Sequence, residues 1–250
     1  MAVEETPQGL QHAPYKGLWN DAVLYSAGNK APIARSKKHL VPFGEYIPFR
    51  EQLPFLEWVF AQSAGFSMNG DVIPGKSTSP MTLEVKGKKV QLTPLICFED
   101  TVPKVASSYQ TQKGGGANFL VNITNDGWFL QSEAADQHYQ NARFRAIEQR
   151  SPLIRAGNTG RTAIVNIFGV EAANHPDSNI ILPSKGSNVV PHESGTYSGV
   201  AYALEEPVET LYRRGGDIFC VSCTVLVLLW VVFQAVASGK ISFGRSQKST

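Results

Sequence analysis

Residues Pro94–Asp100 have the sequence "PLICFED", an apolar run that ends in Cys97 and is followed two residues later by Glu99. A cysteine that only fills a strand core needs no acid beside it, whereas a cysteine that attacks a substrate needs controlled surroundings. A free thiol has a pKa of about 8.5, so a partner must favour the reactive thiolate. On an extended strand, Glu99 would share a face with Cys97 and hold the geometry of the site. The stretch therefore predicts a nucleophilic cysteine at a strand end.

Short apolar runs and turn signals alternate on both sides of this stretch. The expected strands cover residues 22–27, 81–85, 90–98, 118–124, 152–158, 161–169 and 194–204, and residues 134–150 have helical spacing. The segment "KGKK" (86–89) predicts a hairpin, and residues 171–193 have the composition of a loop. A helix between strands is typical of an α/β layered domain, which places its reactive groups at strand ends.

The composition limits the class of protein. With 250 residues, 42% of them hydrophobic, the chain can form one large domain, or one domain with an appendage. The net charge is +2 and no basic block with interleaved aromatics occurs, so we expect no nucleic-acid partner. Three cysteines, of which only Cys97 lies in the polar part of the chain, do not indicate a disulfide framework. No cluster of metal ligands is apparent, and we expect neither a metal nor another cofactor.

Residues Ile218–Ala237 contain no charge over twenty positions. A helix of that length spans about 30 Å, the thickness of a bilayer core, and a buried core helix of that length usually has a polar face. The segment therefore predicts a transmembrane helix, in which Cys220 and Cys223 act as small apolar residues. The basic tail at 238–250 favours the cytoplasm, although Arg213 and Arg214 on the other flank weaken that signal.

Three further motifs accompany "PLICFED": "KKHLVPFGEY" (37–46), "VNITNDGWF" (121–129) and "QHYQNARFRAIEQRSPLIRAGNTGRTA" (137–163). Together they resemble the nitrilase superfamily of carbon–nitrogen hydrolases, and within it the membrane-bound apolipoprotein N-acyltransferase family. The resemblance covers residues 20–237. It implies a nitrilase-like α-β-β-α sandwich, with its N-terminal part missing, followed by one C-terminal transmembrane helix. The expected domains are a partial catalytic domain at 1–212, a membrane helix at 218–237 and a cytoplasmic tail at 238–250.

The same resemblance assigns roles to individual residues. Cys97 is expected to be the nucleophile and Lys37, rather than Lys38, the catalytic lysine, because a fixed ammonium favours a thiolate and stabilises an oxyanion. The expected supporting residues are Glu45, which orients Lys37 or assists proton transfer, together with Glu99, Asn20 and Trp128. Trp128 and Phe129 are expected to form an apolar wall near the thiol, or else to be ordinary core aromatics.

Other chemically suggestive residues are expected to be structural. His39 and His138 are tempting for acid–base chemistry, but the superfamily uses lysine instead. Arg143, Arg145 and Glu148 are expected to form ion pairs on the helix. Two interpretations stay open for the apolar stretch at 48–66, namely a packed helix and an arm over the active site that enters the bilayer.

The implied reaction is fatty acyl transfer from a phospholipid to the N-terminal lipid-modified cysteine of an apolipoprotein, through a thioester on Cys97. The implied location is the bacterial inner membrane, with the catalytic domain facing the periplasm. Two alternatives stay open: a nitrilase-type amidase that hydrolyses a C–N bond, and a catalytically inactive, tail-anchored interaction domain.

The family's triad glutamate lies upstream of the lysine motif, and no residue before Lys37 matches it. Glu4 and Glu5 lie in a polar lead-in without a preceding strand. The sequence therefore predicts the C-terminal part of a longer or split enzyme, and little turnover by these 250 residues alone.

Overall fold

The computed structural model describes residues 3–6, 9–12, 18–26, 31–64, 72–109, 116–129, 132–158, 160–171, 199–205 and 208–238. The chain forms two compact units, Met1–Thr210 and Leu211–Thr250. The predicted loop at 171–193 lies outside the described residues except for Glu171, which forms a bridge with Val165.

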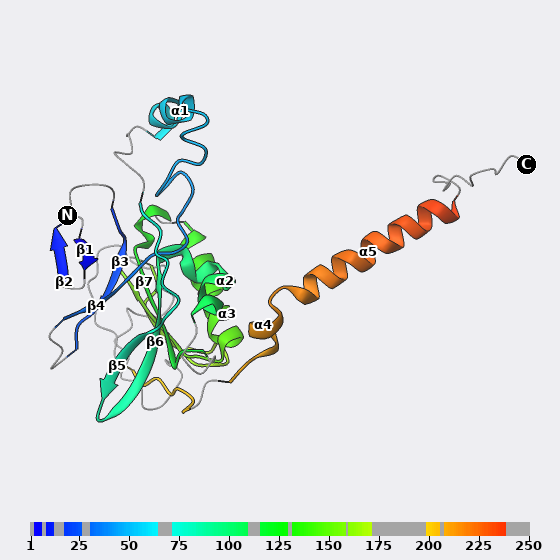
Figure 1. Ribbon diagram of the computed structural model, residues 1–250. Helices are drawn as coiled ribbons and strands as arrows, with labels where there is room; N and C mark the ends of the chain where they lie inside the picture. Colours follow the sequence, from blue (N-terminus) through cyan, green and yellow to red (C-terminus); the bar gives the residue numbers. More distant parts are fainter. Residues whose placement is uncertain are drawn as a thin grey trace, which may run out of the picture. The chain divides into compact units, whose positions relative to one another are not determined.

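A five-stranded mixed sheet is the centre of the first unit (Figure 1). Its strands, in spatial order, are β5 (Met81–Val85), β6 (Lys88–Ile96), β7 (Phe119–Thr124), β8 (Leu153–Gly157) and β9 (Ala163–Val165). The three central strands run parallel, and the two outer strands pair antiparallel to them. The carboxyl ends of β6, β7 and β8 therefore meet at one edge, where α/β sheets usually place their functional groups.

Helices cover one face of this sheet. The elements on that face are the 3₁₀ turn η1 (Cys97–Thr101), α2 (Pro103–Ser108), the 3₁₀ turn η2 (Asp126–Phe129) and α3 (Ala134–Gln149), and α2 and α3 lie side by side (Figure 1). Ala142 and Ala146 of α3 are fully buried against Leu120 and Leu153 of the sheet in the main apolar core. Their small side chains allow the helix to approach the strands closely.

A short hairpin lies on the opposite side of β6. Strands β3 (Asp21–Leu24) and β4 (Ile33–Ser36) pair antiparallel and contribute Ala22, Leu24 and Ile33 to a second apolar cluster with Ile96 and Cys97. Because Leu95 belongs to the main core and Ile96 to the second, the pleat of β6 separates the two layers. The described residues thus show the predicted combination of a mixed sheet and packed helices. A further hairpin joins β1 (Val3–Thr6) and β2 (Gly9–His12).

The β5–β6 hairpin was predicted correctly, but its turn is tighter than the segment 86–89. Lys86 and Gly87 both have positive φ, 49° and 75°, the conformation of a two-residue type I′ turn. A strand was predicted at 194–204; residues 199–204 form no strand, and residues 194–198 lie outside the described ranges.

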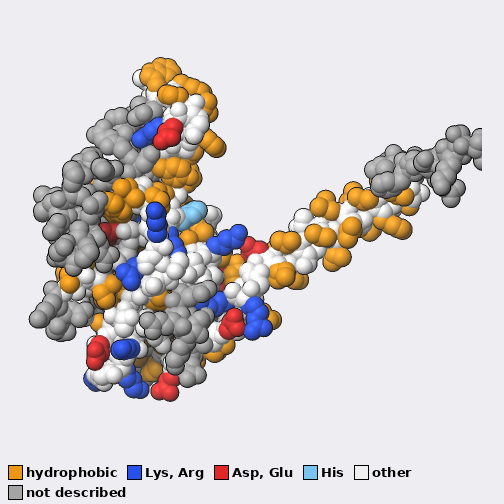
Figure 2. All heavy atoms as spheres, viewed as in Figure 1, with side chains coloured by type: hydrophobic (Ala, Val, Ile, Leu, Met, Phe, Trp, Pro, Cys, Tyr) orange, Lys and Arg blue, Asp and Glu red, His pale blue; other side chains and the backbone are white. Residues whose placement is uncertain are grey.

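Two apolar elements project their side chains into solvent. Helix α1 (Phe55–Ala64) exposes Phe55 and Trp58, and hydrophobic side chains cover it and α5 (Figure 2). In the second unit, α4 (Leu211–Gly215) precedes α5 (Ile218–Ala237), which has the predicted bounds. In the described part of the chain, α5 is the one helix whose length and mean hydropathy of 2.4 suit a membrane span, and none of it is buried.

Candidate active site

Cys97 is the first residue after β6 and the first of η1. Its φ is 53°, in the left-handed region that costs a non-glycine residue of the order of 1 kcal/mol or more. The strained residue turns the chain sharply, so that the half-buried thiol lies at the sheet edge. The predicted strand end is confirmed. The prediction that Glu99 shares a strand face with Cys97 was wrong, because the chain has already entered a 3₁₀ turn.

Glu99 joins the cysteine turn to the lysine loop. Its side chain is 1% exposed and accepts hydrogen bonds from the backbone N–H groups of Ile96 (2.8 Å), Lys38 (2.6 Å) and His39 (2.9 Å). Burial raises the pKa of Glu99, against the effect of these hydrogen bonds and of the Lys37 charge. The acid beside the cysteine is therefore a clamp between two segments that are about sixty positions apart in the sequence.

Lys37 is the fully buried cation of the site. Its Nζ lies 2.8 Å from Oε2 and 2.9 Å from Oε1 of Glu45. The carboxylate of Glu45 also accepts hydrogen bonds from the Val41 N–H and from the side chain of Asn20. The backbone carbonyl of Asn20 in turn accepts a hydrogen bond from the Lys37 backbone N–H at 2.8 Å. The structure thus brings Lys37, Glu45 and Asn20 together, and Glu45 directly contacts the lysine.

Lys38 faces different partners. Its Nζ donates to Ser108 Oγ at 2.5 Å and lies 4.8 Å from the centre of the Tyr109 ring. Burial lowers its pKa, against the attraction of Glu99. This placement supports the choice of Lys37 as the candidate catalytic lysine.

Gly75 holds the strand end that carries Lys37. Its N–H donates to the Lys37 carbonyl at 2.7 Å, and a Cβ added there would lie 2.2 Å from the Ser36 carbonyl oxygen. No side chain fits at that separation, so only glycine allows the two backbones to approach this closely.

Trp128 and Phe129 lie in η2, at the same edge of the sheet. Trp128 is 77% exposed, so it is not a core aromatic, and its role as a wall near the thiol stays a prediction. Phe129 packs edge-on against the His138 ring, with 5.6 Å between the ring centres.

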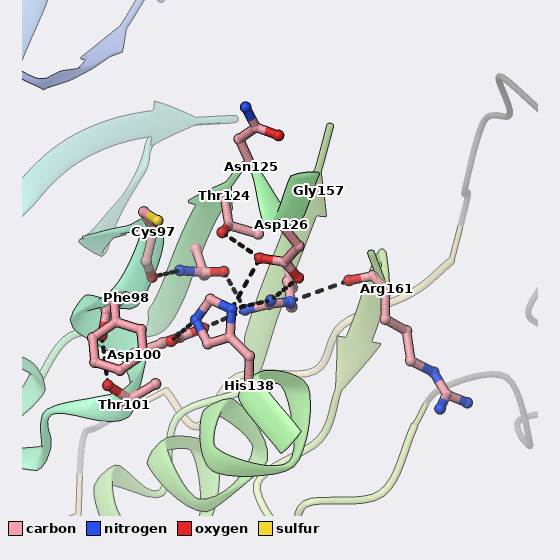
Figure 3. A network of polar contacts seen from close by, with 12 residues as sticks. Cys97, Phe98, Asp100, Thr101, Thr124, Asn125, Asp126, His138, Gly157 and Arg161 are labelled. Carbon is pink, nitrogen blue, oxygen red and sulfur yellow. Dashed lines mark hydrogen bonds and ion pairs between the residues drawn. The ribbon is translucent and has the colours of Figure 1, made fainter. Parts of the chain in front are cut away.

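A buried polar network next to the cysteine turn was missed from the sequence (Figure 3). His138 places Nε2 2.7 Å from Asp100 and Nδ1 2.9 Å from Asp126. Arg155 donates to both carboxylates and, at 2.6 Å, to Asn122. The sequence did contain a signal for this network: Arg155 is a charged residue inside the apolar strand "PLIRAG". A buried charge needs buried partners.

His138 is held as a cation by this network. Burial opposes its charged form, but the hydrogen bonds with Asp100 and Asp126 outweigh burial and raise its pKa to about 9. Burial likewise opposes the charged form of Asp126, but its hydrogen bond with His138 and the charge of Arg155 lower the pKa of Asp126. The expectation that His138 has a structural environment agrees with these contacts.

We expect the stability of the protein to fall as the pH rises from about 6.5 to about 9. The folded-state pKa of His138 is raised from 6.5 to about 9, so its contribution is complete below the lower value and is lost above the higher one. The free energy of unfolding should decrease by up to about 3 kcal/mol over that interval. Urea unfolding at several pH values measures it, and His138→Gln should abolish this part of the dependence. An equal slope in the variant would contradict the assignment.

The two arginines of α3 that were predicted to form ion pairs have different kinds of partner. Arg145 and Glu148 form the predicted ion pair at 2.6 Å. The predicted ion pairing of Arg143 was wrong, because its guanidinium donates to the Gly169 carbonyl and to the side chain of Gln140. Both of these acceptors are neutral, so Arg143 forms hydrogen bonds in place of an ion pair. His39 contributes its backbone N–H to the site, where it donates to Glu99, and the residue as a whole is exposed.

Comparison with known proteins places these features in a family. A sequence model described as carbon-nitrogen hydrolase matches residues 3–190. The apolipoprotein N-acyltransferase of Geobacter metallireducens is 41% identical over 205 residues, 82% of this chain and 34% of that protein. The corresponding protein of Brucella suis is 41% identical over 150 residues, 58% of this chain and 26% of its own length.

This chain spans about a third or less of the length of these relatives. A solved carbon-nitrogen hydrolase from Helicobacter pylori G27 is 17% identical, with a TM-score of 0.45 over 64% of this chain and 54% of that one. Because that score is low, the assignment rests on the sequence match, which covers most of the chain. The chain belongs to the carbon-nitrogen hydrolase family.

Proposed function

We propose that the protein transfers a fatty acyl group from a phospholipid to the N-terminal lipid-modified cysteine of an apolipoprotein. The observation that carries the proposal is the arrangement of Cys97 and Lys37: a strained cysteine turn and a buried, glutamate-paired lysine, tied together by Glu99. The names of the relatives support the choice of substrates.

In the proposed reaction, the Cys97 thiolate attacks the ester carbonyl of the phospholipid. The carbon–oxygen ester bond breaks, a thioester forms, and the released alkoxide takes the proton that the thiol gave up, leaving a lysophospholipid. The amine of the acceptor then attacks the thioester, an amide forms, and the thiol recovers a proton. Lys37 favours the thiolate and stabilises the oxyanion of each tetrahedral intermediate. Glu45 orients Lys37.

The proposed location is the bacterial inner membrane, with α5 as the span, residues 1–212 in the periplasm and residues 238–250 in the cytoplasm. Exposed apolar side chains support contact with lipid: Phe49, Phe55 and Trp58 are 70%, 60% and 66% exposed. These residues belong to the proposed arm at 48–66, which would bring acyl chains to the site.

We expect α5 to keep the chain in the membrane fraction through an alkaline carbonate wash. Twenty uncharged residues provide enough apolar surface for stable insertion, whereas a peripheral protein would be released. A reporter fused after Thr250 should be active only in the cytoplasm. Release by carbonate would refute the span, and reporter activity only outside the cytoplasm would refute the orientation.

Complementation of a strain depleted of its own N-acyltransferase tests the proposed function. The chain should be supplied alone and joined to the preceding part of the Geobacter metallireducens relative. On the prediction that an upstream segment supplies the triad glutamate, only the joined form rescues growth. Full rescue by the chain alone would assign the base to a glutamate present here, Glu45 first. Failure of both forms, with turnover of small amides instead, would favour the amidase alternative.

A further inference from the structure

Four ionisable side chains form one buried network next to the Cys97 turn (Figure 3). Asp100 comes from η1, Asp126 from η2, His138 from α3 and Arg155 from β8, and each is at most 3% exposed. His138 and Arg155 each contact both carboxylates. With His138 protonated, the network contains two positive and two negative charges, and its net charge is zero.

The network is connected to the backbone of the cysteine turn. Asn122 accepts a hydrogen bond from Arg155 at 2.6 Å, and its amide donates to the carbonyl oxygens of Leu95 (2.9 Å) and Cys97 (3.1 Å). Asp100 belongs to the same 3₁₀ turn as Cys97. The Cys97 sulfur points away from His138, so the network contacts the backbone of the turn and leaves the thiol free (Figure 3).

We propose that this network positions the nucleophile: it holds the Cys97 turn in its left-handed conformation and, with His138 as a cation, prevents a net negative charge from developing beside the thiol. The inference rests on the proposed role of Cys97 as the nucleophile. His138 is thus a positioning residue, which acts through η1.

The charge balance depends on His138 in particular. The charged groups that face its ring are Asp100 from η1, Asp126 from η2 and Arg155 from β8, and the rings of Phe98 and Phe129 cover it. The raised pKa of about 9 keeps His138 charged at neutral pH. Without that charge the network has a net charge of −1 in a poorly screened interior, which disfavours formation of a thiolate nearby.

The pH profile of Cys97 alkylation tests the proposal without a phospholipid. The full chain in detergent micelles is treated with iodoacetamide from pH 5 to 10, and mass spectrometry of the peptide that contains Cys97 gives the rate. His138→Gln should move the pH midpoint of alkylation upward by about one unit. Asp126→Asn combined with His138→Gln leaves one carboxylate and one guanidinium, so this double variant should return to the wild-type midpoint. Arg143→Gln removes a cation of α3 outside the network and serves as the matched control.

A merely structural role predicts a different pattern. In that case the double variant, which loses more contacts, would deviate further than His138→Gln, and this result would overturn the proposal. An unchanged midpoint in a folded His138→Gln variant would overturn it as well. If His138→Gln does not fold, Asp126→Asn decides instead: it leaves the network with a net charge of +1, so a downward shift of the midpoint supports the proposal, and an unchanged or raised midpoint contradicts it. If the variants show the predicted midpoints but the protein transfers no acyl group, the result counts against the proposed function and leaves this inference standing.

Discussion

Replacing Cys97 by alanine is expected to reduce acyl transfer to less than about a thousandth of the wild-type rate, because the covalent intermediate can no longer form. The fold should persist, since the half-buried thiol contributes only an edge contact to the smaller apolar cluster. The activity is measured as acyl transfer from phospholipid vesicles to a lipopeptide with a free α-amine. The form of the chain that rescues growth in the complementation experiment is used. Circular dichroism checks the fold.

Replacing Cys220 and Cys223 together by serine provides the matched control. Both residues lie in α5, far along the sequence from the site residues, and both are exposed. The double variant should keep its transfer activity. Activity that survives in Cys97→Ala, or that disappears in the Cys220 and Cys223 variant, would contradict the assignment of the nucleophile.

Glu99→Ala is expected to produce the largest loss of stability among the site variants. The change leaves three backbone N–H groups, those of Ile96, Lys38 and His39, without their carboxylate acceptor. Hydrogen bonds to a charged group contribute about 1.5–3 kcal/mol each, so the free energy of unfolding should fall by about 3–6 kcal/mol, allowing for partial solvation of the freed groups. Urea unfolding measures the change.

The variant Glu99→Gln separates the clamp from the charge. Its carbonyl oxygen can keep the hydrogen bonds from Lys38 and His39, so the loss of stability should be smaller than in Glu99→Ala. Alkylation of Cys97 should slow in the alanine variant, because the cysteine turn is released from the lysine loop. Equal stability of Glu99→Ala and the wild type would show that the clamp is not formed.

The sequence predicted those features that depend on local pattern. The bounds of α5 follow from the absence of charge between Ile218 and Ala237, and the end of β6 at Cys97 follows from an apolar run that stops at polar residues. The pairing of Lys37 with Glu45 followed from the family motif, in which the two residues lie within one loop.

Features set by tertiary contacts could not be predicted in this way. The direction of Glu99 depends on the positive φ of Cys97, which starts a 3₁₀ turn where a strand would have continued. The side-chain partners of Arg155 come from η1, η2, α3 and β7, and no local spacing relates them. Residues 199–204 have strand-like composition, but β-propensity depends on packing against neighbouring strands.

The most direct test of the account is the mass of the Cys97 peptide after exposure to phospholipid. The chain would be incubated with vesicles whose acyl chains carry a deuterium label, quenched in acid and digested. The account predicts a labelled acyl group on Cys97 that hydroxylamine removes and that an added lipopeptide amine takes up as an amide. A labelled acyl group on Cys220 or Cys223 with none on Cys97, or release of the label only as free fatty acid, would contradict it.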